Sequence, residues 1–170
     1  MTVTVYSRTV NGKKGKWEFH SSYVDGMPGG KKREKEYGLF DESVWQDFAK
    51  NVYKSKNDLT TLLLDIKSKG QTVVGNSCPC RASVLINFCG IGKDILPYIA
   101  EQSTSAKLGL HMPGKHMPII DNKILFEEQP DYVLLLAWHI AEPIIKDLRN
   151  RGLKSKFIIP LAAVKVLSAS

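Results

Sequence analysis

The sequence predicts an α/β fold, namely a Rossmann-like parallel sheet with helices on both faces, preceded by an N-terminal β-hairpin and a long helix. Three observations lead to this prediction. From Gly70 onward, short apolar runs alternate with helical segments, which favours a parallel sheet covered on both faces. Before Gly70 lies a long stretch with apolar residues at helical spacing. Before that, two β-rich segments flank a loop rich in turn formers.

The length and composition favour one ordinary domain, or one domain with an extension. The chain has 170 residues, and 43% of them are hydrophobic, which is enough for a substantial core. No apolar run of about 18 residues is present, so we expect no membrane span. The N-terminus lacks the pattern of a signal peptide. The odd cysteine count, with Cys78, Cys80 and Cys89 clustered, indicates a reducing cytoplasm as the location.

The net charge of +7 leaves two interpretations of the early basic residues. They form either a patch for nucleic acid or two solvated loops beside glycines. No aromatic-rich binding motif accompanies the charge, so we favour solvated loops and do not expect nucleic acid as a partner. The residues concerned are Lys13, Lys14, Lys16, Lys31, Lys32, Arg33 and Lys35.

The N-terminal part is predicted to be a hairpin followed by a linker. Thr2–Tyr6 and Lys16–Val24 have β character, and the loop between them contains Asn-Gly. Residues 25–36 carry Pro, paired Gly and charge, which is typical of a loop. We therefore expect residues 1–40 to form a β-hairpin and basic linker, and residues 41–170 to form the Rossmann-like domain with its leading helix.

A long helix is expected between Asp41 and Gly70. Asp41 is a good N-cap, Glu42 suits the first turn, and Gly70 is placed to end the helix. One stripe of this helix is apolar, and we expect it to pack in the core rather than to bind a cofactor. Its members are Trp45, Phe48, Val52, Leu59, Leu62, Leu63 and Ile66.

Strands and helices alternate after Gly70. The predicted strands are Thr72–Gly75, Pro97–Ala100, Met117–Ile120, Tyr132–Trp138 and Lys156–Pro160, with Ala163–Leu167 as a possible edge strand. The predicted helices are Ala82–Phe88, Asn122–Glu128 and Ala141–Arg151. In the last helix, Pro143 suits the first turn and Gly152 the end.

The turn between the first of these strands and its helix, Asn76–Arg81, is predicted to attract anions. Free backbone N–H groups and the helix dipole favour a phosphate there. Ser77 and Cys80 stand where a dinucleotide loop has glycine, so we do not expect NAD. Arg81 either contacts phosphate, with the hydroxyl groups of Ser77 and Ser83, or lies at a solvated helix start.

Ligands of such sheets bind at the carboxyl ends of strands where the strand order reverses. That rule brings the turn together with Glu101 and with Trp138-His139, although Trp138 could be core and His139 a helix cap. The loop 111–118 is held by two prolines and a glycine and carries two histidines; it is either a ligand-binding loop or a surface connection.

The Cys78-Pro79-Cys80 run does not have the spacing of a zinc site, and a second cysteine pair is missing. We therefore expect no metal and interpret the cysteines as small packed residues. A nucleophilic Cys78, with a pKa lowered by the helix dipole, is the alternative.

Three ordered motifs resemble one family. The first, Val-Val-Gly-x-x-x-Pro followed by Leu-x-Asn-x-Cys-Gly-Ile, is met by Gly75, Pro79, Leu85, Asn87, Cys89, Gly90 and Ile91. The second motif is a lysine and a glycine followed by Pro-Gly-x-His-x-Pro-Ile. It is met by Lys107, Gly109, Pro113, Gly114, His116, Pro118 and Ile119. The third motif is Pro-Asp-Tyr-Val-Leu-x-Leu-Ala-Trp. It is met by Pro130, Asp131, Tyr132, Val133, Leu134, Leu136, Ala137 and Trp138. From about Lys69 to Pro160, the chain resembles the C-terminal domain of the S-adenosylmethionine-dependent sugar C-methyltransferases, which act on nucleotide-linked deoxysugars.

The chain departs from that family in its first turn. Arg81 replaces a lysine, and Asn76, Ser77, Cys80 and Ala82 replace Tyr, Gly, Ala and Gly. The family's Glu-His pair and its Glu-x-Gly-x-Gly run are not in this sequence. We therefore expect this chain alone not to transfer methyl groups, and we expect S-adenosylmethionine only in a partner or missing domain.

The resemblance and the strand-end rule together predict a substrate-binding set and no catalytic or metal-binding residue. Arg81 and Lys107 would neutralise phosphate, while Asn87 and His116 would make hydrogen bonds or hold their loops. The full set is Gly75, Asn76, Ser77, Arg81, Ser83, Asn87, Glu101, Lys107, Gly114, His116, Trp138 and His139.

The expected partners are a nucleotide-linked sugar or other phosphorylated small molecule and a methyl-transfer domain or subunit, with a second copy of the chain as a further candidate. Two further functions stay open. One is a stand-alone module that binds another phosphorylated ligand, and the other is a docking subunit without catalysis.

Overall fold

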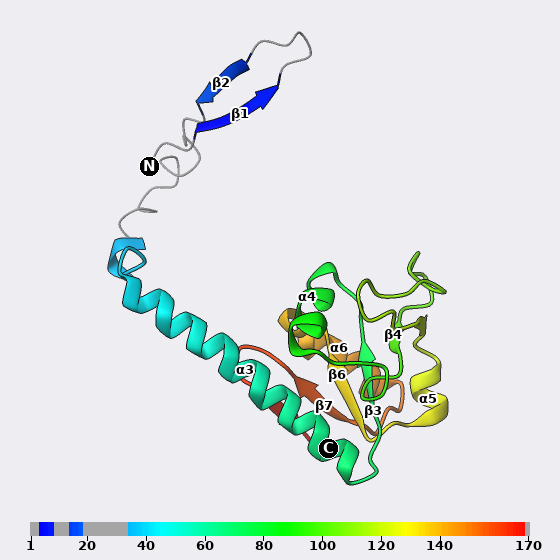
Figure 1. The fold of residues 1–170 in the computed structure, drawn as a ribbon. Coiled ribbons are helices and arrows are strands. Elements are labelled where there is room, and N and C mark those ends of the chain that lie inside the picture. Colours follow the sequence, from blue (N-terminus) through cyan, green and yellow to red (C-terminus); the bar gives the residue numbers. More distant parts are fainter. Residues whose placement is uncertain (1–3, 9–13, 19–33, 169–170) are drawn as a thin grey trace. The chain divides into compact units, whose positions relative to one another are not determined.

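The computed structural model describes residues 4–8, 14–18 and 34–168 (Figure 1). The chain divides into two compact units, Met1–Ala49 and Lys50–Ser170, and helix α3 (Glu42–Ser68) crosses the division. Each unit is described by itself below. The boundary between residues 40 and 41 that the sequence suggests stays a prediction.

The first unit contains the predicted hairpin. Strand β1 (Thr4–Arg8) pairs antiparallel with β2 (Lys14–Glu18), with Thr4 opposite Glu18 and Arg8 opposite Lys14. The loop between these strands lies outside the described residues. So do Lys13, Lys31, Lys32, Arg33 and the linker up to residue 33.

Helix α3 begins and ends where its capping residues predict. The carboxylate of Asp41 accepts a hydrogen bond from the backbone N–H of Ser43 at 2.9 Å. At the other end Gly70 adopts φ +70°, and the N–H of Gln71 donates to the carbonyl of Ile66 at 3.2 Å. This is the left-handed glycine cap that the sequence indicates.

The predicted apolar stripe of α3 is core only in its second half. Leu59, Leu63 and Ile66 are buried, whereas Trp45 and Phe48 are 53% and 60% exposed. The expectation that the whole stripe packs in the core is therefore wrong for the first turns. Helical spacing selects a face of the helix, but burial also requires a neighbouring element, and only the later turns join the core on the sheet.

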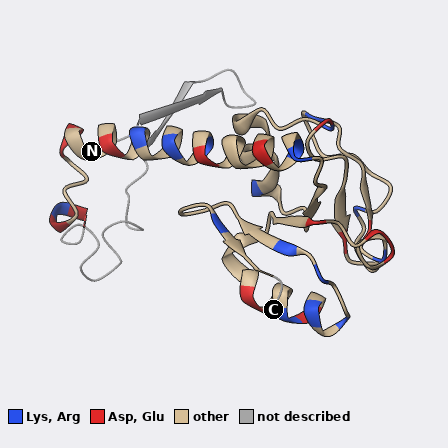
Figure 2. Cartoon of the chain, turned by 90° about the horizontal axis from the view of Figure 1, so that it is seen from below, with Lys and Arg blue, Asp and Glu red and all other residues tan. Residues whose placement is uncertain are grey.

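Basic and acidic side chains are interspersed along α3 (Figure 2). Lys54 pairs with Asp58 at 2.5 Å, and Lys69 pairs with Asp65 at 2.6 Å. Such exposed pairs contribute only a few tenths of a kcal/mol. The described turns of α3 therefore carry mixed charge rather than an uninterrupted basic stripe.

The second unit is built on a six-stranded sheet with the order β5-β4-β3-β6-β7-β8. All neighbouring strands are parallel except β8, which is antiparallel to β7 at the edge. Along the chain, β4 and β5 are added on one side of β3, and β6, β7 and β8 are then added on its other side. The strand order therefore reverses at β3. The strands are β3 (Val73–Asn76), β4 (Ile99–Glu101), β5 (Ile119–Asp121), β6 (Tyr132–Leu135), β7 (Lys156–Ile159) and β8 (Lys165–Leu167).

Helices cover both faces of this sheet, which confirms the predicted fold class (Figure 1). Alternate residues of the strands enter opposite cores, because side chains of a strand point to opposite faces. Val73 and Leu134 join α3 and α4 (Cys80–Cys89), while Val74 and Leu135 join α5 (Ile124–Glu128) and α6 (Ala141–Asn150).

Several predicted boundaries move by a few residues, and two of these shifts lie near the predicted site. Strand β6 ends at Leu135, and Trp138 begins a short 3-10 helix, η1 (Trp138–Ile140), so the predicted strand to Trp138 is too long. Helix α4 begins at Cys80, two residues earlier than predicted. The end of α6 is as expected, with Gly152 at φ +93°.

A polar tie, made of the hydrogen bonds between Asp131 and Thr72, joins the starts of β3 and β6. The carboxylate of Asp131 accepts hydrogen bonds from the backbone N–H of Thr72 at 2.8 Å and from its hydroxyl at 3.0 Å. These bonds stabilise the charged form and lower the pKa of Asp131.

Candidate functional site

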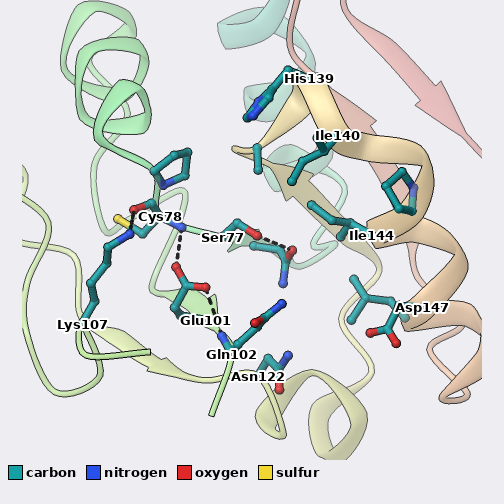
Figure 3. A pocket seen from close by; sticks show the side chains of 15 residues that line it. Ser77, Cys78, Glu101, Gln102, Lys107, Asn122, His139, Ile140, Ile144 and Asp147 are labelled. Carbon is teal, nitrogen blue, oxygen red and sulfur yellow. Dashed lines mark hydrogen bonds between the residues drawn. The ribbon is translucent and has the colours of Figure 1, made fainter. Parts of the chain in front are cut away.

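A cavity of about 480 Å³ lies where β3, β4 and β6 end, between the β3–α4 turn and α6 (Figure 3). This is the place where the strand order reverses, and where sheets of this kind bind ligands. Its lining combines polar side chains with an apolar wall. The lining residues are Asn76, Ser77, Cys78, Pro79, Glu101, Gln102, Lys107, Asn122, Ala137, His139, Ile140, Pro143, Ile144, Asp147 and Leu148.

The β3–α4 turn forms one wall of the cavity. Ser77 adopts φ +65°, a left-handed conformation that costs about 1–2 kcal/mol for a residue with a Cβ atom. Its N–H donates to the carbonyl of Ala100 at 2.8 Å, and its hydroxyl donates to the side-chain oxygen of Asn76 at 3.1 Å. The tight turn is therefore maintained by hydrogen bonds although it carries serine.

Two charged side chains hold the backbone of Cys78. The carboxylate of Glu101 accepts a hydrogen bond from the Cys78 N–H at 2.9 Å, and Lys107 Nζ donates to the Cys78 carbonyl at 2.6 Å. The second carboxylate oxygen of Glu101 accepts from the N–H of Gln102 at 3.1 Å (Figure 3). In this structure the carboxylate of Glu101 therefore occupies the Cys78 N–H, and the phosphate expected at this turn stays a prediction.

The first turn of α4 leaves backbone N–H groups without partners among the residues that the structure describes. Helix α4 begins after Pro79 without a side-chain cap. Within the described residues, the N–H groups of Cys80 and Arg81 have no partner, so the positive end of the α4 dipole is open there. An additional anion would therefore find its donors beside Arg81 rather than at Cys78.

Two nearly buried carboxamides face the cavity. Asn76 is 4% exposed and Asn122 is 5% exposed. The backbone N–H of Asn122 donates to the carbonyl of Glu101 at 2.8 Å, and Arg151 donates to the side-chain oxygen of Asn122 at 3.4 Å. Across the cavity lie Ile144 and Asp147 of α6 (Figure 3).

The cysteines are packed residues in two cases out of three. Cys78 and Cys89 are buried, and Cys80 is exposed. Burial raises the pKa of Cys78 more than the nearby Lys107 lowers it. The alternative of a Cys78 nucleophile with a lowered pKa is therefore wrong. No group of three metal-ligating side chains gathers in the described part of the chain.

The structure brings together five of the predicted site residues. These are Asn76, Ser77, Glu101, Lys107 and His139, all in the cavity lining. Arg81 and Trp138 lie next to each other, with the guanidinium 6.0 Å from the centre of the ring.

The remaining predicted residues have local contacts outside the cavity lining. Gly75 is buried in the sheet, where a Cβ atom would lie 3.1 Å from Ile99 Cγ1, so close strand packing accounts for it. The hydroxyl of Ser83 donates to the carbonyl of Cys80 at 2.8 Å.

The loop 111–118 is fastened to α4. Asn87 Nδ2 donates to the carbonyl of Pro113 at 3.1 Å and to that of Ser83 at 2.7 Å. Gly114 has φ +90° and His116 has φ +52°, and a Cβ atom on Gly114 would collide with the Asn87 amide. For Asn87, these contacts favour the alternative that it holds a loop.

Sequence reasoning missed three polar residues of the cavity. Gln102 follows Glu101, and Asn122 follows the end of β5, so applying the strand-end rule to every strand would have found both. Asp147 lies in the middle of α6, and no sequence signal distinguishes it from other exposed helical carboxylates.

The sheet order defines a Rossmann-like α/β domain with a cavity at the strand reversal. The family model described as "C-methyltransferase C-terminal domain" matches residues 20–162. C-methyltransferase NovU from Streptomyces niveus is 31% identical over 140 residues, covering 80% of this chain and 32% of that protein. The chain belongs to the C-methyltransferase C-terminal domain family, which confirms the resemblance found in its motifs.

The chain spans about a third of the length of this curated relative. No helix among the described residues is long and apolar enough to cross a membrane.

Proposed function

We propose that this chain holds a nucleotide-linked sugar while a separate methyl-transfer domain or subunit delivers a methyl group to it. Membership of the C-methyltransferase C-terminal domain family supports the reaction class. The observation that carries the substrate proposal is the polar cavity at the strand reversal, with a basic residue and an open helix start beside it.

The anionic part of the ligand has candidate partners at the mouth of the cavity. Lys107 lines it, and the open N–H groups of Cys80 and Arg81 point the positive end of α4 outward. Arg81 lies beside Trp138, whose neighbour His139 is in the lining. These groups offer a diphosphate both charge and backbone donors.

The role proposed for this chain is binding and orientation. S-adenosylmethionine supplies the electrophilic methyl group, and we assign it to the other domain. We likewise assign the base that removes a proton beside the keto group of the sugar to that domain. Fixing the sugar in one orientation lowers the entropic part of the barrier to methyl transfer.

A thermal-shift measurement with deoxythymidine-diphosphate glucose (dTDP-glucose) tests this proposal. At a ligand concentration of about 100 times Kd, binding adds about 2.7 kcal/mol, or roughly 5–10 °C in Tm for a chain of this length. Each variant is compared with its own ligand-free Tm. We expect Lys107→Ala and Arg81→Ala to reduce the shift, and Lys93→Ala, an exposed lysine outside the lining, to retain it.

The proposal fails if neither dTDP-glucose nor another nucleotide-linked sugar changes Tm at millimolar concentration. A stand-alone module for another phosphorylated ligand is the second candidate, and the occupation of the Cys78 N–H by Glu101 favours it. A shift with simple phosphate esters but not with nucleotide-linked sugars would select that candidate. Nucleic-acid binding with a steep salt dependence would instead select a docking role.

A further inference from the structure

The ionisable lining of the cavity offers a diphosphate no excess of positive charge. It consists of the carboxylates of Glu101 and Asp147, the ammonium group of Lys107, and His139. Apart from His139, two negative charges face one positive charge in the lining, and Arg151, outside the lining, pairs with Asp147 at 3.3 Å. The two carboxylates would repel a further anionic group placed between them.

The positive charge in the lining lies at one edge of the cavity. Lys107 donates to the Cys78 carbonyl at 2.6 Å, so it lies at the turn, on the opposite side of the cavity from Asp147 (Figure 3). The open N–H groups that favour an anion belong to Cys80 and Arg81, and neither residue lines the cavity. The preferred place for phosphate is thus the mouth of the cavity.

The interior instead offers the groups that recognise hydroxyls. A carboxylate has about four acceptor positions. Glu101 uses its two oxygens to accept one backbone bond each, which fixes its orientation and leaves acceptor capacity. Asn76 and Asn122 are both more than nine-tenths buried and add carboxamide groups. A hydroxyl group donates and accepts at once, so it can satisfy a carboxylate and a carboxamide together.

Position in the fold supports the same interpretation of Glu101. It is the last residue of β4, the strand that follows β3 along the chain and pairs with it. In dinucleotide-binding sheets, an acidic residue about 20 residues after the glycine-rich turn accepts a hydrogen bond from a ribose hydroxyl. The opposite wall carries Ile140 and Ile144, which suit the C–H face of a ring.

We propose that this cavity holds an uncharged, hydroxyl-bearing ring, with Glu101 as the acceptor for its hydroxyl groups, and that the diphosphate stays at the mouth beside Lys107 and the start of α4. The inference rests on the proposed function, since it assigns the two parts of a nucleotide-linked sugar to two places. The ring is either the hexose or the pentose of the nucleotide, which share this chemistry.

Calorimetric titrations of the full chain with dTDP-glucose and with pyrophosphate test the assignment. Glu101→Gln keeps an oxygen for the Cys78 N–H but replaces the second acceptor with a donor. We expect this variant to bind dTDP-glucose about tenfold more weakly, as for the loss of one hydrogen bond to a charged group. Its affinity for pyrophosphate should be unchanged or higher, because a negative charge has gone.

Asp147→Asn provides a second variant that leaves the β3–α4 turn untouched, since Asp147 pairs with Arg151, four residues later in the chain. It should weaken dTDP-glucose and spare pyrophosphate in the same way. Glu127→Gln, on the exposed side of α5 and outside the lining, is the matched control and should change neither affinity. An equal loss, or an equal gain, for both ligands in the Glu101 variant would overturn the inference.

Probes without phosphate separate the inference from the proposed function. Methyl glucoside represents the hexose, and thymidine represents the deoxyribose of dTDP-glucose. A shift of the side-chain amide signals of Asn76 and Asn122 in ¹⁵N-resolved NMR with either probe supports the inference, even if dTDP-glucose does not bind and the proposed function fails. If dTDP-glucose binds but neither probe moves these signals at high millimolar concentration, the inference fails and the proposed function stands; if nothing binds, both fail.

Discussion

Replacing Gly114 with alanine should destabilise the chain through one identified collision. Gly114 has φ +90°, and an added Cβ atom would lie 2.1 Å from Asn87 Oδ1 and 2.6 Å from its Nδ2. The Asn87 amide would have to swing away. It would then lose its hydrogen bonds to the carbonyls of Pro113 and Ser83.

Two costs add in this variant. The left-handed backbone costs a residue with a Cβ atom about 1–2 kcal/mol, and the lost hydrogen bonds of an exposed amide cost about 1 kcal/mol. Gly114→Ala should therefore lower the free energy of unfolding by about 2–3 kcal/mol. In a chain that already carries Asn87→Ala, the collision is absent, so the same substitution should cost about 1 kcal/mol less.

Urea unfolding of the wild type, both single variants and the double variant measures these terms, with the slope m checked for constancy. The prediction is refuted if Gly114→Ala costs the same in both backgrounds, or if it costs less than about 0.5 kcal/mol. Either result would mean that Asn87 does not fasten the loop 111–118 to α4.

Three further predictions concern the turn, the polar tie and the cysteines. Ser77→Gly should be about 1 kcal/mol more stable than Ser77→Ala in urea unfolding, because both lose the hydroxyl but only glycine relieves φ +65°; equal stabilities would contradict a strained turn. The pKa of Asp131 is lowered from 3.8, so its contribution to stability is full above that value and is lost as the pH falls through the lower, folded-state pKa. Asp131→Asn should therefore flatten the fall of stability below about pH 4, and an unchanged profile would show that the tie to Thr72 does not form. Iodoacetamide at neutral pH should modify Cys80 before Cys78, because burial raises the pKa of Cys78; mass spectrometry showing the reverse order would contradict this.

Much of the fold follows from local rules that the chain obeys. Asp41 and Gly70 mark the ends of α3 because capping depends on residues within one turn of the helix end. The alternation of strands and helices predicts the doubly covered sheet, because a parallel strand requires a crossover connection. The family motifs are likewise local, and the chain retains them in order.

What sequence reasoning missed depends on contacts between distant segments. The spacing of Trp45 and Phe48 marks a helix face but not whether anything covers it, and both are largely exposed. The turn was expected to attract phosphate, yet Glu101, separated from Cys78 by 23 residues, supplies the anion. Asp147 lines the cavity only because α6 packs beside β6. The residues next to Asp147 in the sequence give no sign of this packing.

The most direct measurement is a crystal structure of the chain soaked with dTDP-glucose. The account predicts a hexose or deoxyribose ring between Glu101 and Asn122, with the diphosphate at the mouth beside Lys107 and the first turn of α4. Density for the ligand at the loop 111–118, with the cavity unchanged, would contradict it.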